Sequence, residues 1–415
     1  MNILLINHYA GSDELGMEFR PYYMSREWVK QGHDVTVLAA TYSHLRKVNP
    51  VVEKDFTEQY VDGVRYLWVK APAYKSNNHM RMVNIITFYN KVKHRAKELA
   101  EKYKPDIIIG SSTYPHDMRL VNYIADISGG KRIFEVHDLW PATMIYVHGF
   151  AENNLFTKYI AKAEKFAYEN TDAVVSIWSH VNIRMQELGV DKPYHYIPNG
   201  IIIDGSSKVD EAPEELKAQV EALRAQGKFI TMYLGGFAAA NALEEFIDSA
   251  DYLDENQVIM LVGDGMMKDE YKNRVSEKSR DKVIFVPKVN KTQVKKTLEL
   301  ADCCYIGAKK SLLYRYGAGM NKIFDYMYAS RPIIFGIETP SNPIKEADCG
   351  LTIEAGSPQA IAEAIKTLNA APKQELEEMG RRGYDFALEN YGYKRLSGMF
   401  INAMQSLLDE RKEER

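Results

Sequence analysis

The chain has 415 residues, a formal net charge of −3 and 46% hydrophobic residues. This length is enough for two domains of ordinary size, and the near-neutral charge argues against nucleic acid as the main partner. The three cysteines (Cys303, Cys304 and Cys349) lack the spacing of a zinc site or a disulfide framework. The sequence has no signal peptide and no apolar run of about 20 residues, so we expect a cytoplasmic protein without a membrane span.

The first residues predict a parallel α/β sheet. A strand at 3–6, a loop, a helix ending near Gly32 and a strand at 35–38 form a βαβ unit. The first loop lacks the GxGxxG dinucleotide fingerprint, but Gly11 and Gly16 make a looser glycine loop. His8 and Glu18 in this loop are either site residues or solvated loop residues.

Residues 80–103 keep the spacing of one long helix. Met82, Ile86 and their helical neighbours predict a core-facing stripe. A second stripe carries a basic and aromatic set that can lie on anionic lipid. Its members are Arg81, Phe88, Lys91 and Arg95. The alternative is an ordinary solvated helix face.

Strands at 107–110 and 133–136 continue the sheet, and the second leads into EVHDLWP. His137 follows this strand directly, where open α/β sheets bind ligands. Alternatively, its side chain caps a neighbouring backbone group. A further strand at 174–177 precedes a polar stretch at 204–213, which we interpret as a linker.

The second half repeats the strand–loop pattern. Strands at 229–234, 258–262 and 283–286 lead into loops that contain Gly235, Gly265 and Lys288, respectively. Each loop follows the carboxyl end of a predicted strand, so these residues are candidates for a shared binding edge.

Residues 301–335 predict a strand, a glycine loop, a helix and another strand. The loop carries Lys309 and Arg315, and Asn321 is the expected helix N-cap. A glycine loop that leads into a helix start suits phosphate. Lys322, with Asp325 one turn later, suits a diphosphate beside a sugar diol. The alternative is an amphipathic helix after a flexible loop.

The segment LLYRYGAGMNKIFDYMYASRPII resembles the nucleotide-binding segment of the GT-B glycosyltransferases, specifically the retaining family four. The segments GMEFRPYYMSREWVKQGHDVTVL, YHYIPNGI and SNPIKEADCGLTIEAGSPQAIAEAI resemble the family at the expected places. The resemblance implies an α/β protein of two doubly wound Rossmann-like domains facing a cleft. Residues 1–200 would bind the acceptor and residues 201–385 the nucleotide sugar, and a helix in 386–415 would pack back on the first domain.

The same resemblance implies roles for individual residues. His137 would face the donor sugar, and the Gly16 loop would lie against donor phosphate and acceptor. Lys322 and the helix start at Asn321 would meet the leaving diphosphate, with Lys309 and Arg315 as supplements. The remaining implied contacts are Asp325 with the ribose hydroxyls, the nucleobase at the Gly265 turn followed by Lys288, and Asn342 near the diphosphate and ribose.

The chain departs from the family pattern at three places. Gly236 and Asn241 stand where many relatives have the Arg and Lys of GRLxxxK, and Gly235 opens this loop. The loop instead resembles a GxHGxAN branch found in transferases for bacterial surface polysaccharides, with Phe237 in place of the histidine. Gly317 stands where the first acid of the Glu-x7-Glu pattern is usual.

The resemblance implies a retaining hexosyl- or N-acetylhexosaminyl-transferase. We expect a nucleotide-sugar donor, UDP-linked, and a lipid-linked or saccharide acceptor in capsule, O-antigen, lipopolysaccharide or exopolysaccharide synthesis. No DxD triplet occurs, so neither a metal nor another cofactor is expected. We expect a cytoplasmic protein, peripheral on the anionic inner face of the membrane. The alternatives are a nucleotide-sugar 2-epimerase of the same fold and a non-catalytic nucleotide-sugar-binding protein.

Overall fold

The computed structural model describes residues 1–75, 79–203 and 208–413. The chain divides into two compact units, Met1–Pro198 with Tyr393–Arg415, and Asn199–Gly392. Part of the predicted linker, residues 204–207, lies outside the described residues.

The first unit is built on an eight-stranded sheet in the order β3-β4-β2-β1-β5-β6-β7-β8. All neighbouring strands are parallel except β3 and β4, which form an antiparallel hairpin that the sequence analysis did not predict. The strands are β1 (Asn2–Ile6), β2 (Asp34–Ala40), β3 (Thr57–Val61), β4 (Val64–Val69), β5 (Ile107–Gly110), β6 (Lys131–Val136), β7 (Ala173–Ser176) and β8 (Tyr194–Tyr196).

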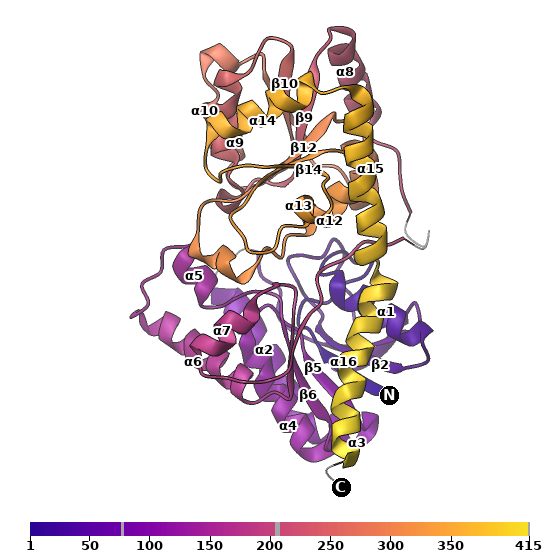
Figure 1. Ribbon diagram of the computed structural model, residues 1–415. Helices are drawn as coiled ribbons and strands as arrows, with labels where there is room; N and C mark the ends of the chain where they lie inside the picture. The colour runs from indigo at the N-terminus through magenta and orange to yellow at the C-terminus, as the bar shows by residue number, and fades with distance from the viewer. Residues whose placement is uncertain (76–78, 204–207, 414–415) are drawn as a thin grey trace. The chain divides into compact units, whose positions relative to one another are not determined.

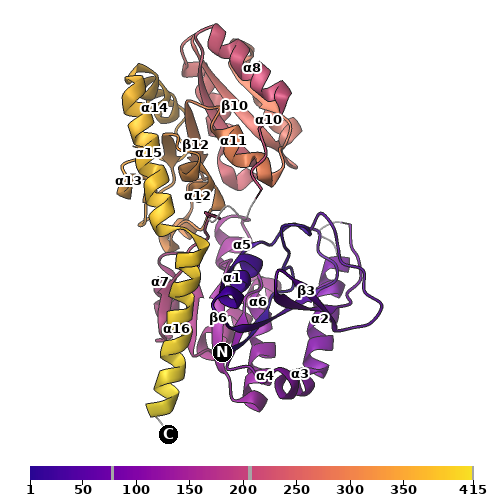
Figure 2. The same cartoon turned by 90° about the vertical axis from the view of Figure 1, so that its right-hand side faces the viewer.

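Helices cover both faces of this sheet (Figure 1). They are α1 (Arg20–Lys30), α2 (His79–His94), α3 (Ala96–Tyr103), η1 (Pro115–Asp117), α4 (Met118–Ser128), α5 (Ala142–Tyr146), α6 (Leu155–Glu169), α7 (Val181–Glu187) and α16 (Tyr393–Glu413). The β1–β2 and β5–β6 connections run in opposite directions along the sheet, so right-handed crossovers place α1 and α4 on opposite faces. The chain's last helix, α16, packs on α1, where the rings of Trp28 and Phe400 lie 5.0 Å apart (Figure 2).

The helix predicted at 80–103 is two helices, because α2 ends at His94 and α3 starts at Ala96. The prediction that Phe88 lies on an outward stripe is wrong. Phe88 is fully buried, with its ring centroid 4.9 Å from that of His8. Met82 and Ile86, predicted to face the core, are instead exposed. The buried stripe of α2 consists of Asn84, Phe88 and Val92, so burying the aromatic ring fixes the rotation of the helix.

The second unit has a six-stranded sheet, parallel throughout, in the order β11-β10-β9-β12-β13-β14. Its strands are β9 (Phe229–Gly236), β10 (Gln257–Asp264), β11 (Val283–Val286), β12 (Cys303–Gly307), β13 (Ile333–Gly336) and β14 (Gly350–Thr352). Its helices are α8 (Glu214–Ala225), η2 (Ala239–Asn241), α9 (Leu243–Ser249), η3 (Ala250–Tyr252), α10 (Lys268–Arg274), η4 (Glu277–Ser279), η5 (Lys291–Gln293), α11 (Val294–Leu298), η6 (Leu312–Tyr316), α12 (Asn321–Tyr328), α13 (Pro343–Glu346), α14 (Pro358–Ala370) and α15 (Lys373–Asn390).

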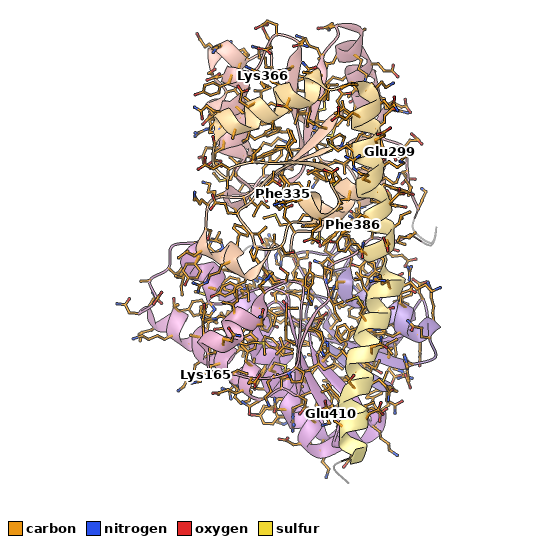
Figure 3. The ribbon with its side chains drawn as sticks, viewed as in Figure 1. Lys165, Glu299, Phe335, Lys366, Phe386 and Glu410 are labelled. Atoms are coloured by element: carbon orange, nitrogen blue, oxygen red, sulfur yellow. The ribbon has the colours of Figure 1, made fainter. Side chains whose placement is uncertain are left out.

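The interior of the second unit is filled from both faces of its sheet. Phe335 of β13 is fully buried (Figure 3), and Phe246 of α9 stacks on Tyr305 of β12 with ring centroids 4.4 Å apart. Strands buried on both faces are the expected form of a parallel sheet covered by helices. The prediction of an α/β fold with two parallel-sheet domains is therefore confirmed.

One predicted boundary differs from the structure. The chain returns to the first unit at Tyr393, seven residues after the predicted position 386. The reason is that α15 runs to Asn390 and packs on α12 of the second unit. Gly380 lets the two elements approach closely, because a Cβ at Gly380 would lie 2.3 Å from the Ser330 carbonyl oxygen.

Candidate active site

In the second unit, the carboxyl ends of the parallel strands meet at one edge of the sheet. The loop after β9, the start of α12 and the segment after β12 bring together four of the predicted residues. They are Gly235, Asn241, Lys309 and Lys322. This is the edge where open α/β sheets bind ligands.

Lys322 is the centre of this group. Its Nζ donates to Asn241 Oδ1 at 2.7 Å and lies 5.2 Å from the centre of the Tyr233 ring. No carboxylate in the described part of the chain pairs with it. Desolvation of the partly buried ammonium lowers the pKa of Lys322 to about 8. A cation in this state is stabilised by any anion that reaches it.

Two features fix the position of Lys322. Tyr326, one turn later in α12, accepts a hydrogen bond from Leu234 N at 2.7 Å and donates one to Leu234 O at 3.0 Å, which ties the helix to the end of β9. Gly235 then leaves room for the lysine, because a Cβ there would lie 2.6 Å from Lys322 Cε. A larger residue at this position would displace the end of the Lys322 side chain.

The loop after β9 is held by polar contacts as well. Asn241 Nδ2 donates to the Gly236 carbonyl oxygen at 2.9 Å, while its Oδ1 accepts from Lys322. Lys309 Nζ lies 2.9 Å from Glu244 Oε1, and Lys309 N donates to Ala240 O at 3.3 Å. Asn241 therefore orients the Lys322 ammonium and ties it to the loop after β9.

Asp325 and Asn342 already have protein partners. Both carboxylate oxygens of Asp325 accept from Lys291 Nζ at 2.8 Å. Asn342 caps α13, with Oδ1 accepting from the amides of Ile344 and Lys345 at 3.1 Å. The Lys291 side chain of this ion pair is half-exposed, so the pair contributes little to stability. A ligand hydroxyl can therefore take the place of Lys291 at Asp325 at small cost.

The other predicted residues lie at the same edge or in its loops. Asn321 is not the N-cap of α12, because the helix starts at Asn321 and Met320 is the cap, without a side-chain cap. Arg315 Nη2 donates to Tyr316 OH at 2.6 Å. Gly265 lies in the turn after β10, where a Cβ would lie 2.4 Å from Phe237 O, and Lys288 is exposed after β11.

In the first unit, a charged network lies at the carboxyl ends of β5 and β6. The Glu135 carboxylate accepts hydrogen bonds from Arg20 Nε at 2.9 Å and from Ser111 Oγ at 2.5 Å. It also pairs with His137 Nε2 at 3.1 Å. Burial alone would raise the pKa of Glu135, but the charges of Arg20 and His137 lower it to about 2. Burial opposes the charged imidazole of His137, but Glu135 beside it outweighs this and raises the pKa of His137.

The first loop completes this network. Gly16 has φ +100° and pairs with both Ser12 and Arg46 through isolated bridges, which folds the loop back over the sheet edge. Glu18 accepts from Asn7 Nδ2 at 3.2 Å, and its Oε2 lies 4.0 Å from His137 Nδ1. Burial raises the pKa of Glu18. The His137 ring therefore bonds side chains and does not cap a backbone group.

Sequence reasoning missed Glu135 and Arg20. Glu135 stands among the apolar residues of the predicted strand IFEV. This was a usable signal, because a carboxylate in a buried strand needs a partner. Arg20 lies 115 positions earlier, and nothing in the sequence pairs the two.

The basic stripe predicted for lipid is largely neutralised. Lys91 Nζ pairs with Asp55 Oδ2 at 2.8 Å, and Arg95 pairs with Glu98 Oε2 at 2.7 Å. Arg81 Nε donates to Tyr9 OH at 3.1 Å. With Phe88 in the core, this stripe lacks the aromatic anchor that the prediction required.

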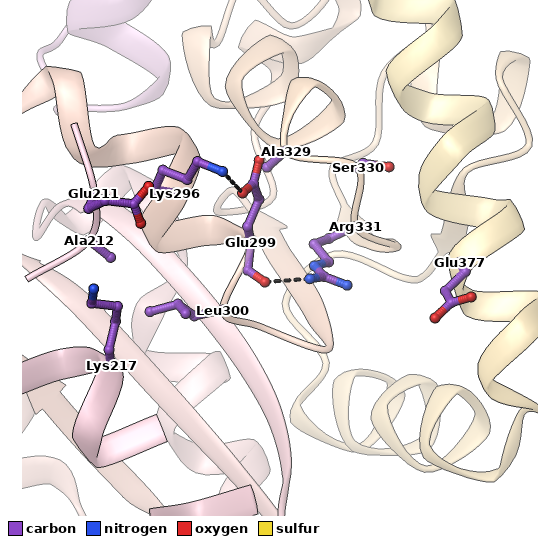
Figure 4. A pocket seen from close by; sticks show the side chains of 10 residues that line it. All are labelled: Glu211, Ala212, Lys217, Lys296, Glu299, Leu300, Ala329, Ser330, Arg331 and Glu377. Atoms are coloured by element: carbon purple, nitrogen blue, oxygen red, sulfur yellow. Dashed lines mark hydrogen bonds and ion pairs between the residues drawn. The ribbon is translucent and has the colours of Figure 1, made fainter. Parts of the chain in front are cut away.

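A pocket of about 430 Å³ lies at the opposite edge of the second unit's sheet (Figure 4). It is lined by residues before β12 and β13, including Glu299 and Arg331. Lys296 Nζ pairs with Glu299 Oε2 at 2.9 Å, and Arg331 donates to the Glu299 carbonyl oxygen. Because it lies at the amino ends of the strands and contains none of the residues described above, it is not the candidate active site.

Comparison with known proteins assigns the family. Residues 16–204 match the family described as Glycosyltransferase Family 4, and residues 215–386 match Glycosyl transferases group 1. The two matches together span most of the chain, and the chain belongs to the glycosyltransferases of the GT-B fold. A search of curated protein sequences returns no match.

Solved structures of the same fold cover the whole chain. Sucrose-phosphate synthase from Thermosynechococcus elongatus aligns with a TM-score of 0.75 at 15% identity, over 98% of this chain and 99% of that one. Anabaena HepE in complex with UDP gives 0.68 at 13% identity, over 98% and 100%. WaaG, a glycosyltransferase of lipopolysaccharide biosynthesis, gives 0.65 at 13%, over 98% and 99%. Among the helices of the described residues, none is long and apolar enough to cross a membrane.

The buried network of the first unit predicts a large loss of stability when Arg20 is removed. Arg20→Met leaves the Glu135 charge buried with less compensation, so the first unit should lose about 3–5 kcal/mol. All four tryptophans lie in this unit, so urea unfolding followed by their fluorescence measures it selectively. The double variant Arg20→Met/Glu135→Met should lose less than Arg20→Met alone.

A matched control uses a surface pair of the same unit. Arg95 pairs with Glu98 at 2.7 Å, and both side chains are about half exposed, so Arg95→Met should cost less than about 1 kcal/mol. Equal losses for Arg20→Met and Arg95→Met would contradict the assigned importance of the network.

Proposed function

We propose that this chain transfers a sugar from a UDP-linked donor to a saccharide carried on a lipid, with retention of the anomeric configuration and without a metal. The observation that carries the proposal is Lys322, an ammonium with no carboxylate partner in the described residues, at the carboxyl edge of the second unit's sheet. The UDP complexes of Anabaena HepE and the lipopolysaccharide role of WaaG support the donor and the acceptor class.

In this reaction the second unit stabilises the leaving diphosphate. The bond from the sugar C1 to the diphosphate oxygen breaks with its electron pair on the phosphate, and the acceptor oxygen forms the new bond to C1 on the same face. The acceptor proton passes to the leaving phosphate. The negative charge that grows on the phosphate is then met by Lys322 and the first amides of α12, where a metal-dependent enzyme would use a cation.

The first unit supplies the acceptor side of this reaction. His137, held between Glu135 and Glu18, carries a positive charge over a wider pH range than a free histidine because its pKa is raised. A cationic imidazole near the leaving diphosphate would stabilise the negative charge that develops on the phosphate. With a lipid-linked acceptor, the protein would act at the cytoplasmic face of a membrane, in the synthesis of capsule, O-antigen or exopolysaccharide.

Turnover of radiolabelled UDP-sugars with lipid-diphosphate-linked saccharides tests the proposal. Transfer should occur in EDTA, and nuclear magnetic resonance of the product should show the donor's anomeric configuration. His137→Ala should lower the transfer rate about 100-fold and leave UDP affinity unchanged. Interconversion of the donor sugar without acceptor would instead identify a 2-epimerase, and UDP-sugar binding without any conversion would identify a non-catalytic binding protein.

The affinity for UDP should fall above pH 8. In the free protein Lys322 has a pKa of about 8, and the bound diphosphate raises that pKa by favouring the ammonium. Affinity is therefore constant below the free pKa and falls by up to tenfold per pH unit above it. Isothermal titration between about pH 7 and 9.5 measures this. Lys322→Met should bind UDP more weakly and remove the pH dependence, and an unchanged profile would contradict the assignment.

Asp325 should contribute to binding rather than to the rate. The ribose does not change during transfer, so Asp325→Asn should lower UDP affinity by about tenfold to a hundredfold and leave turnover at saturation nearly normal. The matched control is Lys291→Met, which removes the partner of Asp325 without touching the nucleotide. Its UDP affinity should be unchanged. Equal losses in the two variants would show that Asp325 acts only through its ion pair.

A further inference from the structure

Large apolar side chains are concentrated on the surface where α6 starts. Within ten residues Phe150 is 43% exposed, Leu155 86%, Phe156 43% and Tyr159 59%. Leu155 and Tyr159 are one helical turn apart, so they share a face. Single exposed apolar residues need no explanation, but a cluster of this kind marks an interaction site.

This surface is not a badly packed part of the core. The opposite side of α6 is buried through Thr157, Ile160, Ala163 and Tyr168, so the helix already has a complete inward face. Tyr159 rests on His116 of η1, with ring centroids 4.9 Å apart. The outward apolar residues are therefore held in place and do not need another part of this unit to cover them.

The same face carries positive charge. The side chains of Lys158 and Lys162 lie on it, one turn apart, and neither side chain has an ion pair or a hydrogen bond with any residue that the structure describes. One exposed acid, Glu152, precedes the helix, and the acids within the helix are engaged elsewhere. Glu164 accepts Arg184 Nη2 at 2.6 Å, and Glu169 lies 3.7 Å from Lys165 in the last turns.

We propose that the first two turns of α6, with Leu155, Phe156, Tyr159, Lys158 and Lys162, dock this unit on an anionic lipid surface. A helix face that combines exposed Leu, Phe and Tyr side chains with lysines is suited to the boundary between headgroups and acyl chains. The lysine stems extend along the apolar residues while their ammonium groups reach the lipid phosphates.

The charges favour lipid over a second copy of the chain. In a two-fold dimer through this face, Lys158 and Lys162 would meet the same lysines of the other copy, because such an interface pairs a patch with itself. Repulsion between like charges opposes that arrangement. Anionic headgroups meet both requirements of the face, since they offer negative charge and an apolar layer beneath it.

The position of this face of α6 fits the proposed function. The biological purpose of the docking surface rests on that proposal. α6 returns from β6 to β7, so its first turns lie at the carboxyl edge of the first sheet, the edge that holds His137 (Figure 1). α2 starts at the same edge and exposes Met82, Val83 and Ile86. Docking through α6 would bring this edge, and a lipid-linked acceptor with it, to the membrane surface.

Vesicle sedimentation tests the docking surface with the full chain. The parent protein should sediment with vesicles of about 30% phosphatidylglycerol in phosphatidylethanolamine at about 0.1 M salt, and not with pure phosphatidylcholine vesicles. Lys158→Gln/Lys162→Gln and Leu155→Ser/Tyr159→Ser should each weaken binding at least tenfold, since each basic residue near such a surface gives about fivefold. Lys97→Gln/Lys104→Gln, two exposed lysines near the amino end of β5 in the same unit, should leave binding unchanged.

Three results would overturn the proposal: a parent protein that ignores anionic vesicles, α6 variants that bind as the parent does, or variants that change only the oligomeric state in light scattering. The last would identify an interface between copies. UDP titration of every protein separates this question from the proposed function. Vesicle binding without UDP binding would refute the transferase and keep the docking surface, and the reverse would refute only the docking surface.

Discussion

The second unit depends on a partly buried ammonium for which the described residues offer no negative partner. Lys322 is placed over the end of β9 by Tyr326 and admitted there by Gly235, and its one hydrogen bond goes to the neutral Asn241. Removing a cation from water without an opposite charge is costly, and the pKa lowered to about 8 reflects that cost. A diphosphate bound as proposed would supply the missing opposite charge, so the cost of desolvating Lys322 in the free protein would favour binding of the ligand.

Much of this arrangement follows from the sequence because its causes are local. The apolar runs before Gly235, Gly265 and Lys309 predict buried parallel strands, and parallel strands place the following loops at one edge. The Asp62-Gly63 turn was an equally local signal that went unused. Both residues have positive φ, 49° and 81°, as the Asp-Gly pair of a tight hairpin requires.

What the sequence could not supply is pairing between distant residues. The partners of Glu135 come from positions 20, 111 and 137, and no local pattern joins them. The predicted rotation of α2 was wrong for a similar reason. Helical spacing allows two apolar stripes there. Phe88 is buried in preference to Met82 and Ile86 because it packs against the His8 ring of the first loop. Tertiary packing decides between faces that periodicity leaves equal.

Gly317 shows how a departure from the family pattern is built into the backbone. It follows η6 with φ +111° and ψ −173°, a conformation that is open to glycine and costly for a glutamate. An acidic residue at this position would therefore require a different path of the loop. Glu244, in the first turn of α9 after Asn241, is paired with Lys309 at 2.9 Å. If the proposed transfer is correct, we therefore expect donor choice in this chain to depend on the loop after β9 more than on the loop before α12.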